Sequence, residues 1–204
     1  MSGDVQVRFC ERLGVRFPRA THPVLAFSCE EDARRVLEVL PKRFGKYGLA
    51  LHPEKTRLVE FKRPDRRSPV EGGARRSGTF DLLGFTHYWA KSRKGKWVVK
   101  WKTARDRFSR ALKRVAEWCR RNRHQSVRDQ WHTLVQKLRG HFGYYGIRHN
   151  FRALHRYREE VKRVWRKWLS RRSQRGHVPW DRMEKLMERY PLPPARIRRP
   201  YCPA

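Results

Sequence analysis

Acidic side chains are scarce in this chain. Its 204 residues include 19 aspartates and glutamates against 51 lysines and arginines, which gives a formal net charge of +32 at pH 7. This imbalance excludes a surface whose charges neutralise one another. We therefore expect a polyanionic partner, either nucleic acid or an anionic membrane.

Long apolar runs are also missing. No stretch approaches the roughly 20 apolar residues that cross a bilayer, and residues 1–22 lack the apolar core of a signal peptide. These absences exclude a membrane-spanning segment. We expect no membrane partner, and the charge favours a phosphate backbone, whose binding releases counterions. We expect a cytoplasmic protein associated with nucleic acid.

The few cysteines form no recognisable site. Cys10, Cys29, Cys119 and Cys202 are scattered, without a C-x-x-C pair or a histidine at zinc-ligand spacing. We therefore expect reduced thiols and no metal site in this chain. Apolar residues make up only 38% of the chain, but eight tryptophans and ten phenylalanines supply anchors for a core, so the sequence does not predict general disorder.

Three amphipathic segments lie between Lys102 and Gly176. The second opens with Ser126 and Asp129, the pattern of a capping box, and we expect it to end at Gly140. The third starts near Asn150. The apolar positions, which recur every three or four residues and include four tryptophans, are Phe108, Ala111, Leu112, Val115, Trp118 and Cys119; Val127, Trp131, Leu134, Val135 and Leu138; and Phe151, Leu154, Tyr157, Val161, Val164, Trp165, Trp168 and Leu169. This periodicity predicts a three-helix bundle with a buried core.

The predicted bundle is strongly basic. Residues 102–176 hold 23 lysines and arginines against 5 acidic residues, a net charge of +18. A phosphate backbone would relieve this repulsion and release counterions. The predicted phosphate contacts are Arg105, Arg110, Arg114, Arg121, Lys137, Arg139, Arg148, Arg152, Arg163 and Lys167.

The segment GHFGYYG, residues 140–146, alternates glycines with aromatic side chains. We predict RNA contacts for His141, Tyr144 and Tyr145, because aromatic rings stack on bases while glycine lets the backbone approach phosphate. The alternative is that these rings pack the junction of the bundle. We expect one tyrosine in the core and one near RNA, with Phe142 in the core.

The rest of the chain predicts smaller elements. Residues 1–22 show no clear period. An α/β fragment is predicted by a strand at 23–28, a helix from Cys29 that Pro41 kinks or ends, and a strand at 55–61.

Residues 62–79 are expected to form a basic loop. Residues 80–102 predict a β-hairpin that turns at 91–95, in which Gly84 permits either a close backbone approach or a bulge. A short helix follows Pro179, and residues 191–204 are expected to lie extended on the surface. The fold class is α+β with helices predominating.

Three motifs in this order, LHPEKTRLVEF, TFDLLGFTHY and LRGHFGYYGIRHN, resemble the C-terminal half of group II intron-encoded reverse transcriptase/maturase proteins. The closing PLPPARIRRPY is similar to the end of bacterial members that lack an endonuclease domain. The resemblance covers about residues 23–201. It implies an RNA-directed DNA polymerase family whose partner is group II intron RNA or an RNA/DNA duplex. It also implies that residues 23–61 end the palm, with Lys55 near the active site.

The same resemblance assigns the later segments. It implies that the hairpin at 80–102 grips the primer end, through Phe80, Leu83, Gly84 and Phe85. It further implies that residues 103–190 form the thumb, or maturase-specific domain X, which binds the duplex and the intron RNA.

One departure from the family bears on chemistry. Family members carry Tyr-Ala-Asp-Asp before the strand that here reads PVLAFS, and those carboxylates hold the Mg²⁺ ions of nucleotidyl transfer. This chain has Arg19, Ala20, Thr21 and His22 there. We therefore expect no catalytic residues and no polymerase activity from this chain alone, with Mg²⁺ needed only by the full-length family enzyme. The missing carboxylates favour a solvated Lys55 over a catalytic one, and we expect the fingers and the first palm carboxylate to lie upstream of Met1.

Other functions compete with this interpretation. The chain is alternatively a stand-alone basic RNA chaperone without intron specificity, or a remnant without a selected function. A nuclease of the HNH type is not favoured, because His149, Asn150 and His155 lack a ββα frame and an opposed metal ligand. Asn150 is interpreted instead as a helix N-cap.

Overall fold

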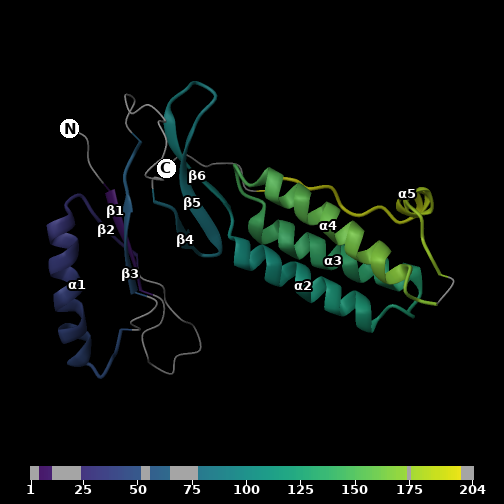
Figure 1. Cartoon of the computed structure of the whole chain (residues 1–204), viewed down its shortest axis with the longest axis horizontal. Coiled ribbons are helices and arrows are strands. Elements are labelled where there is room, and N and C mark those ends of the chain that lie inside the picture. Colours follow the sequence, from purple (N-terminus) through teal and green to yellow (C-terminus); the bar gives the residue numbers. More distant parts are fainter. Residues whose placement is uncertain (1–4, 11–23, 52–55, 65–77, 174–175, 199–204) are drawn as a thin grey trace. The chain divides into compact units, whose positions relative to one another are not determined.

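The chain has a mixed α+β fold in the computed structural model, which describes residues 5–10, 24–51, 56–64, 78–173 and 176–198 (Figure 1). Long-range contacts divide these residues into two units. The first holds the described residues up to Phe80 together with His87–Lys100, and the second holds Asp81–Thr86 and the described residues from Trp101 onward. None of the described helices combines the length and apolar character that a bilayer span requires.

The first unit contains a three-stranded antiparallel sheet. Strand β1 (Val5–Cys10) lies between β2 (Val24–Phe27) and β3 (Thr56–Phe61). Val7 pairs with Ala26 on one side and with Val59 on the other. The predicted strands at β2 and β3 are confirmed, whereas the strand within residues 1–22 was missed.

Helix α1 (Glu30–Gly45) connects β2 to β3 in the first unit. Three acidic residues occupy its first turn and two basic residues its last, which complements the helix dipole. Ala33 is its fully buried residue. Of the two predicted effects of Pro41, a kink or an end, the end does not occur, because the helix continues for one more turn to Gly45.

Strands β4 (Phe80–Leu82), β5 (Phe85–Lys91) and β6 (Trp97–Thr103) pair in that order. The predicted hairpin between β5 and β6 is confirmed, with the Ser92 amide donating to the Lys96 carbonyl at 2.7 Å. The sequence FDLLGFTHYWA does not form one strand. Its chain turns at Leu83 and Gly84, whose φ angles of 51° and 82° suit a two-residue hairpin turn with the twist of the flanking strands.

Three long helices make up most of the second unit. They are α2 (Arg105–Arg121), α3 (Val127–Tyr145) and α4 (Phe151–Leu169), which lie side by side in Figure 1. Their apolar stripes meet in one core that includes Cys119, Leu134 and Trp165, each 0% exposed. Burial raises the pKa of the Cys119 thiol to about 12, so the thiol stays protonated. The predicted helices and their buried faces are confirmed, except at Phe151, which is 50% exposed at the start of α4.

Helix α3 is longer than its sequence suggests. Its start is as predicted, because the Ser126 hydroxyl accepts a hydrogen bond from the Asp129 amide at 3.1 Å. The predicted end at Gly140 is wrong, since the helix continues to Tyr145. Phe142, 3% exposed, extends the apolar stripe past the glycine, and that burial offsets the poor helix propensity of glycine.

Two buried amides join the helices to their surroundings. Gln130, 1% exposed, donates to the carbonyl of Asn122 at 2.8 Å and accepts from the Trp165 indole at 2.9 Å, which ties the α2–α3 loop to α4. Asn150 occupies the N-cap position of α4, but its side chain does not cap the helix. It accepts from the Thr103 amide and donates to the Tyr145 carbonyl, both at 2.8 Å, and so joins the ends of β6 and α3.

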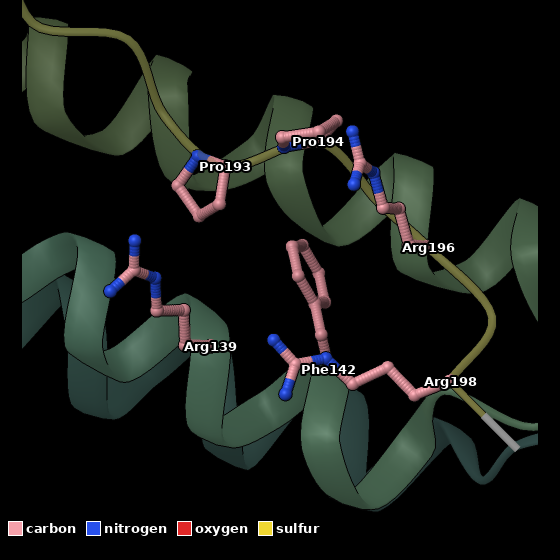
Figure 2. Close-up of a pocket in the computed structure, with 6 residues that line it drawn as sticks. All are labelled: Arg139, Phe142, Pro193, Pro194, Arg196 and Arg198. Carbon is pink, nitrogen blue, oxygen red and sulfur yellow. The ribbon is translucent and has the colours of Figure 1, made fainter.

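Helix α5 (Trp180–Arg189) follows Pro179 as predicted, and its Met183 is fully buried. Residues 191–198, here called the tail, are irregular as expected but do not simply lie on the surface. Leu192 is 2% exposed within the helical core, and the Trp131 indole donates to the Pro191 carbonyl at 2.9 Å. Figure 2 shows the tail passing over α3 at Phe142.

Candidate nucleic-acid interface

All ten cationic side chains predicted to contact phosphate are exposed. Two of them have carboxylate partners, because Arg110 pairs with Asp106 and Arg163 pairs with Glu160. Arg148 has an interaction of its own and is left aside. The other seven form no ion pair with a described carboxylate; they are Arg105, Arg114, Arg121, Lys137, Arg139, Arg152 and Lys167. The second unit therefore presents a largely unneutralised positive surface, a pattern that is typical of proteins that bind nucleic acid.

Four arginines on α2 share one side of the helix. Arg107, Arg110, Arg114 and Arg121 follow at spacings of three, four and seven residues, which places them in one row. We call this row the α2 stripe. Its 14-residue span is about 21 Å at 1.5 Å per residue, long enough to contact several phosphates. Lys137 of α3 lies close to α2, because its ammonium is 5.6 Å from the centre of the Trp118 ring.

A second cationic row lies on α4. Arg152, Arg163 and Lys167 occupy the side opposite the buried Leu154, Val161 and Trp165, as helical spacing requires. We call this row the α4 stripe. Because α2 and α4 lie side by side, the helical unit presents cations over more than one helix.

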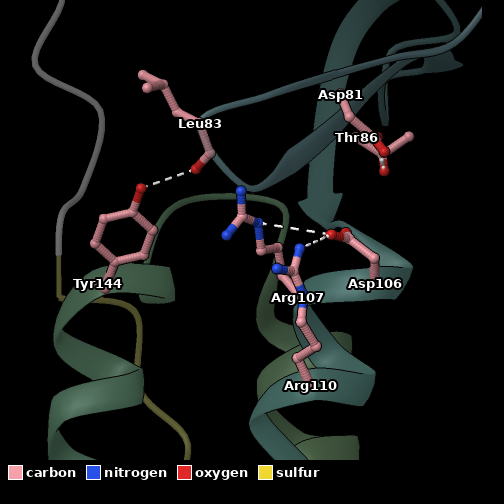
Figure 3. Close-up of polar contacts among 7 residues, drawn as sticks. All are labelled: Asp81, Leu83, Thr86, Asp106, Arg107, Arg110 and Tyr144. Atoms are coloured by element: carbon pink, nitrogen blue, oxygen red, sulfur yellow. Dashed lines mark hydrogen bonds and ion pairs between the residues drawn. The ribbon is translucent and has the colours of Figure 1, made fainter. Parts of the chain in front are cut away.

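The tight turn at Leu83 and Gly84 lies beside the start of the α2 stripe, as Figure 3 shows. The Tyr144 hydroxyl donates to the Leu83 carbonyl at 2.8 Å, and the Gly84 carbonyl accepts from the Ala104 amide at 2.9 Å. Leu83 is 65% exposed and Tyr144 is 54% exposed. The turn thus adds an apolar side chain and an aromatic ring to the edge of a cationic surface, which is the combination that unpaired bases favour.

A single carboxylate orients the first turn of the α2 stripe. Asp106 pairs with Arg110 and lies 3.7 Å from Arg107 (Figure 3). Partial burial works to raise the pKa of Asp106, but the hydrogen bond from Arg110 and the two guanidinium charges outweigh it and hold the pKa below its usual value. Asp106 therefore stays ionised and pairs with both guanidinium groups.

Aromatic rings connect the turn to the core of the helices. Phe85 lies 5.3 Å from Tyr145, and the His141 ring stacks on Tyr157 at 3.8 Å. Burial lowers the pKa of His141 to about 4, so its imidazole is neutral at pH 7 and adds no positive charge to the surface. Phe142 is buried as predicted, Tyr145 is half-buried against the core, and Tyr144 is the exposed member.

Replacing Gly84 with alanine should destabilise the second unit more than replacing Gly95 destabilises its own hairpin. Both glycines have positive φ angles, 82° and 71°, where a Cβ costs roughly 1–2 kcal/mol. A Cβ at Gly84 would also lie 3.1 Å from the Tyr145 hydroxyl, whereas one at Gly95 meets no atom within 4 Å. Urea unfolding of Gly84→Ala and Gly95→Ala measures the difference, and equal losses would show that the Tyr145 contact is unimportant.

The remaining predicted residues are dispersed. Of the four residues assigned to a primer grip, Leu83, Gly84 and Phe85 gather at the turn. Phe80 belongs to the first unit, where its ring lies 4.8 Å from Phe61. Arg105 opens α2, Arg148 lies between α3 and α4, and Arg139 faces the tail. Lys55, residues 11–23 and most of the basic loop at 62–79 lie outside the described residues.

Sequence reasoning left Arg107 out of the predicted phosphate contacts, although it continues the spacing of the other α2 arginines. Leu83 was named as a primer-grip residue, but its exposed position in a left-handed turn was not predicted. Leucine in such a turn has no sequence signal. Neither the comparison with models of protein families nor the search of curated proteins gave a match to this chain.

Proposed function

We propose that the helical unit binds structured RNA through the α2 and α4 stripes and the turn at Leu83–Gly84. The observation that supports this most directly is the α2 stripe, a row of four exposed arginines in which, among the described residues, only Arg107 and Arg110 pair with a carboxylate. Cations without carboxylate partners are stabilised when phosphates neutralise them, and counterion release adds to that gain.

The partner that we propose is group II intron RNA or an RNA/DNA duplex, with this chain acting as the thumb or maturase part of an intron-encoded reverse transcriptase. Support comes from the motif order described above and from the position of LRGHFGYYGIRHN, which supplies the end of α3 and the buried Asn150. We propose no polymerisation by this chain alone, because Arg19–His22 stand where the family carries its carboxylates.

Binding to a group II intron RNA should exceed binding to an unrelated structured RNA of equal length, and the preference should persist as salt rises. Binding through phosphate contacts alone weakens by a factor of about 10³–10⁵ between roughly 50 and 200 mM salt. An affinity difference between the two RNAs that remains at high salt therefore reports sequence- or structure-specific contacts. Fluorescence anisotropy across this salt range measures both affinities. Equal affinity for the two RNAs at every salt concentration would instead support a general RNA chaperone, and no measurable binding would exclude both functions.

A further inference from the structure

A pocket of about 230 Å³ lies between α3 and the tail, apart from the α2 stripe. Figure 2 shows the Phe142 ring pointing into it, with Arg139 on the α3 side and Arg196 and Arg198 on the tail side. The remaining lining residues are Pro193 and Pro194. Among the described residues, every charged member of the lining is therefore an arginine, and none is a carboxylate.

The backbone that forms the pocket is held in place by contacts outside it. The Arg198 amide donates to the Gly146 carbonyl at 2.8 Å, which fixes the tail to the end of α3. At the other end, the buried Leu192 and the indole of Trp131 hold the start of the tail. Two consecutive prolines between these anchors restrict the backbone further. The pocket is thus preformed, so a ligand would not have to order the chain.

Arg139, Arg196 and Arg198 are exposed residues, and none of their guanidinium groups forms a hydrogen bond or ion pair with another described residue. Like charges held around one pocket repel each other, and an anion between them removes that repulsion. Arginine presents a planar fork of donors that matches the oxygens of phosphate and binds them in pairs. The chemistry of the lining therefore selects a phosphate-bearing ligand.

Charge and size narrow the ligand further. Three arginines favour a monoester, whose charge is about −1.5 to −2 at pH 7, over a backbone diester with a single charge. Phe142 and the two prolines give an apolar wall for the carbon part that carries the phosphate. The volume lies below the roughly 300–1,000 Å³ of pockets for drug-sized ligands, so it suits a phosphate and the sugar that carries it, with the rest of the ligand outside the pocket.

We propose that this pocket binds a phosphate monoester carried on a sugar, as in a nucleoside monophosphate or the 5′ end of a nucleic-acid strand. The site uses no residue of the α2 or α4 stripes. An experiment can therefore disprove this site without disproving the proposed RNA binding, and the reverse also holds. Because the ligand bridges α3 and the tail, its binding holds the tail closed.

Trypsin cleavage of the full-length chain after Arg196 and Arg198 tests the proposal. Adenosine monophosphate at about ten times its dissociation constant should slow this cleavage by roughly tenfold, as mass action requires. Adenosine, and potassium chloride at matched ionic strength, should leave the rate unchanged. Peptide mass spectrometry follows the tail peptides.

The variant Arg139→Gln should lose the protection, whereas Arg182→Gln, an exposed arginine of α5 outside the pocket, should keep it. Taking the ratio of rates with and without ligand within each variant cancels any change in tail packing. Equal protection by adenosine or chloride, or full protection of Arg139→Gln, would overturn the proposal.

Two further arms identify the source of the phosphate. A 5′-phosphorylated RNA oligomer that protects the tail at lower concentration than its 5′-hydroxyl form indicates a strand end. Protection by adenosine monophosphate without any difference between the two oligomers indicates a free nucleotide. Both results support the monoester site, and neither requires binding of an intron.

Discussion

Replacing Trp165 with alanine should destabilise the helical unit by about 3–5 kcal/mol. Trp165 is 0% exposed and lies among the core residues of α4, so its removal leaves a cavity that the surrounding helices fill only in part. The indole also donates to the Gln130 side chain at 2.9 Å. Because Gln130 holds the α2–α3 loop through the Asn122 carbonyl, the loss extends beyond the cavity. Urea unfolding followed by circular dichroism measures the change.

Trp165→Phe separates the two contributions. Phenylalanine refills much of the cavity but cannot donate to Gln130, whose buried oxygen is then left without a partner at a cost of about 1–3 kcal/mol. Trp180→Ala, at a side chain that is 41% exposed, serves as the control and should cost much less. A Trp165→Ala variant as stable as the Trp180→Ala variant would contradict the central position given to Trp165.

Removing three charges from the α2 stripe should weaken RNA binding by about 10- to 100-fold at low salt. The variant carries Arg110→Gln, Arg114→Gln and Arg121→Gln, all at exposed positions, so the fold should be retained. Each lost phosphate contact makes the slope of log affinity against log salt concentration shallower by about 0.7–0.9. Three lost contacts should therefore reduce the magnitude of this slope by about two to three. Affinity measurements at several salt concentrations give both quantities.

A matched variant controls for net charge. Arg182→Gln, Lys185→Gln and Arg189→Gln remove three charges from exposed positions of α5 in the same unit. If the α2 stripe contacts phosphates directly, this variant should keep nearly the original slope. Equal losses in the two variants would mean that overall charge, rather than the stripe, determines binding.

The helices were predictable because each long segment repeats its apolar residues at one period. The predicted end of α3 at Gly140 was wrong because the apolar period continues beyond this glycine. No described contact would obstruct a Cβ there, and the aromatic residues beyond it continue the stripe, so burial outweighs propensity. Strand β1 was recognisable in principle, since VQVRFC alternates apolar and polar residues.

The candidate interface was only partly predictable. Exposure of the cations followed from their position opposite the apolar stripes, and the structure agrees at all ten. The contact of Leu83 with Tyr144 joins residues 61 positions apart, and the pocket joins Arg139 to Arg196 and Arg198. Local sequence patterns carry no information on such pairings, because tertiary packing alone brings them together.

The tail has a consequence for biosynthesis. Leu192 fills a place in the core of the helical unit, and the Pro191 carbonyl accepts from Trp131 on α3. A domain folding during translation cannot complete its core while one of its parts is still inside the ribosome. The helical unit therefore matures only after the segment through Arg198 has emerged, and until then its apolar stripes are open to chaperones.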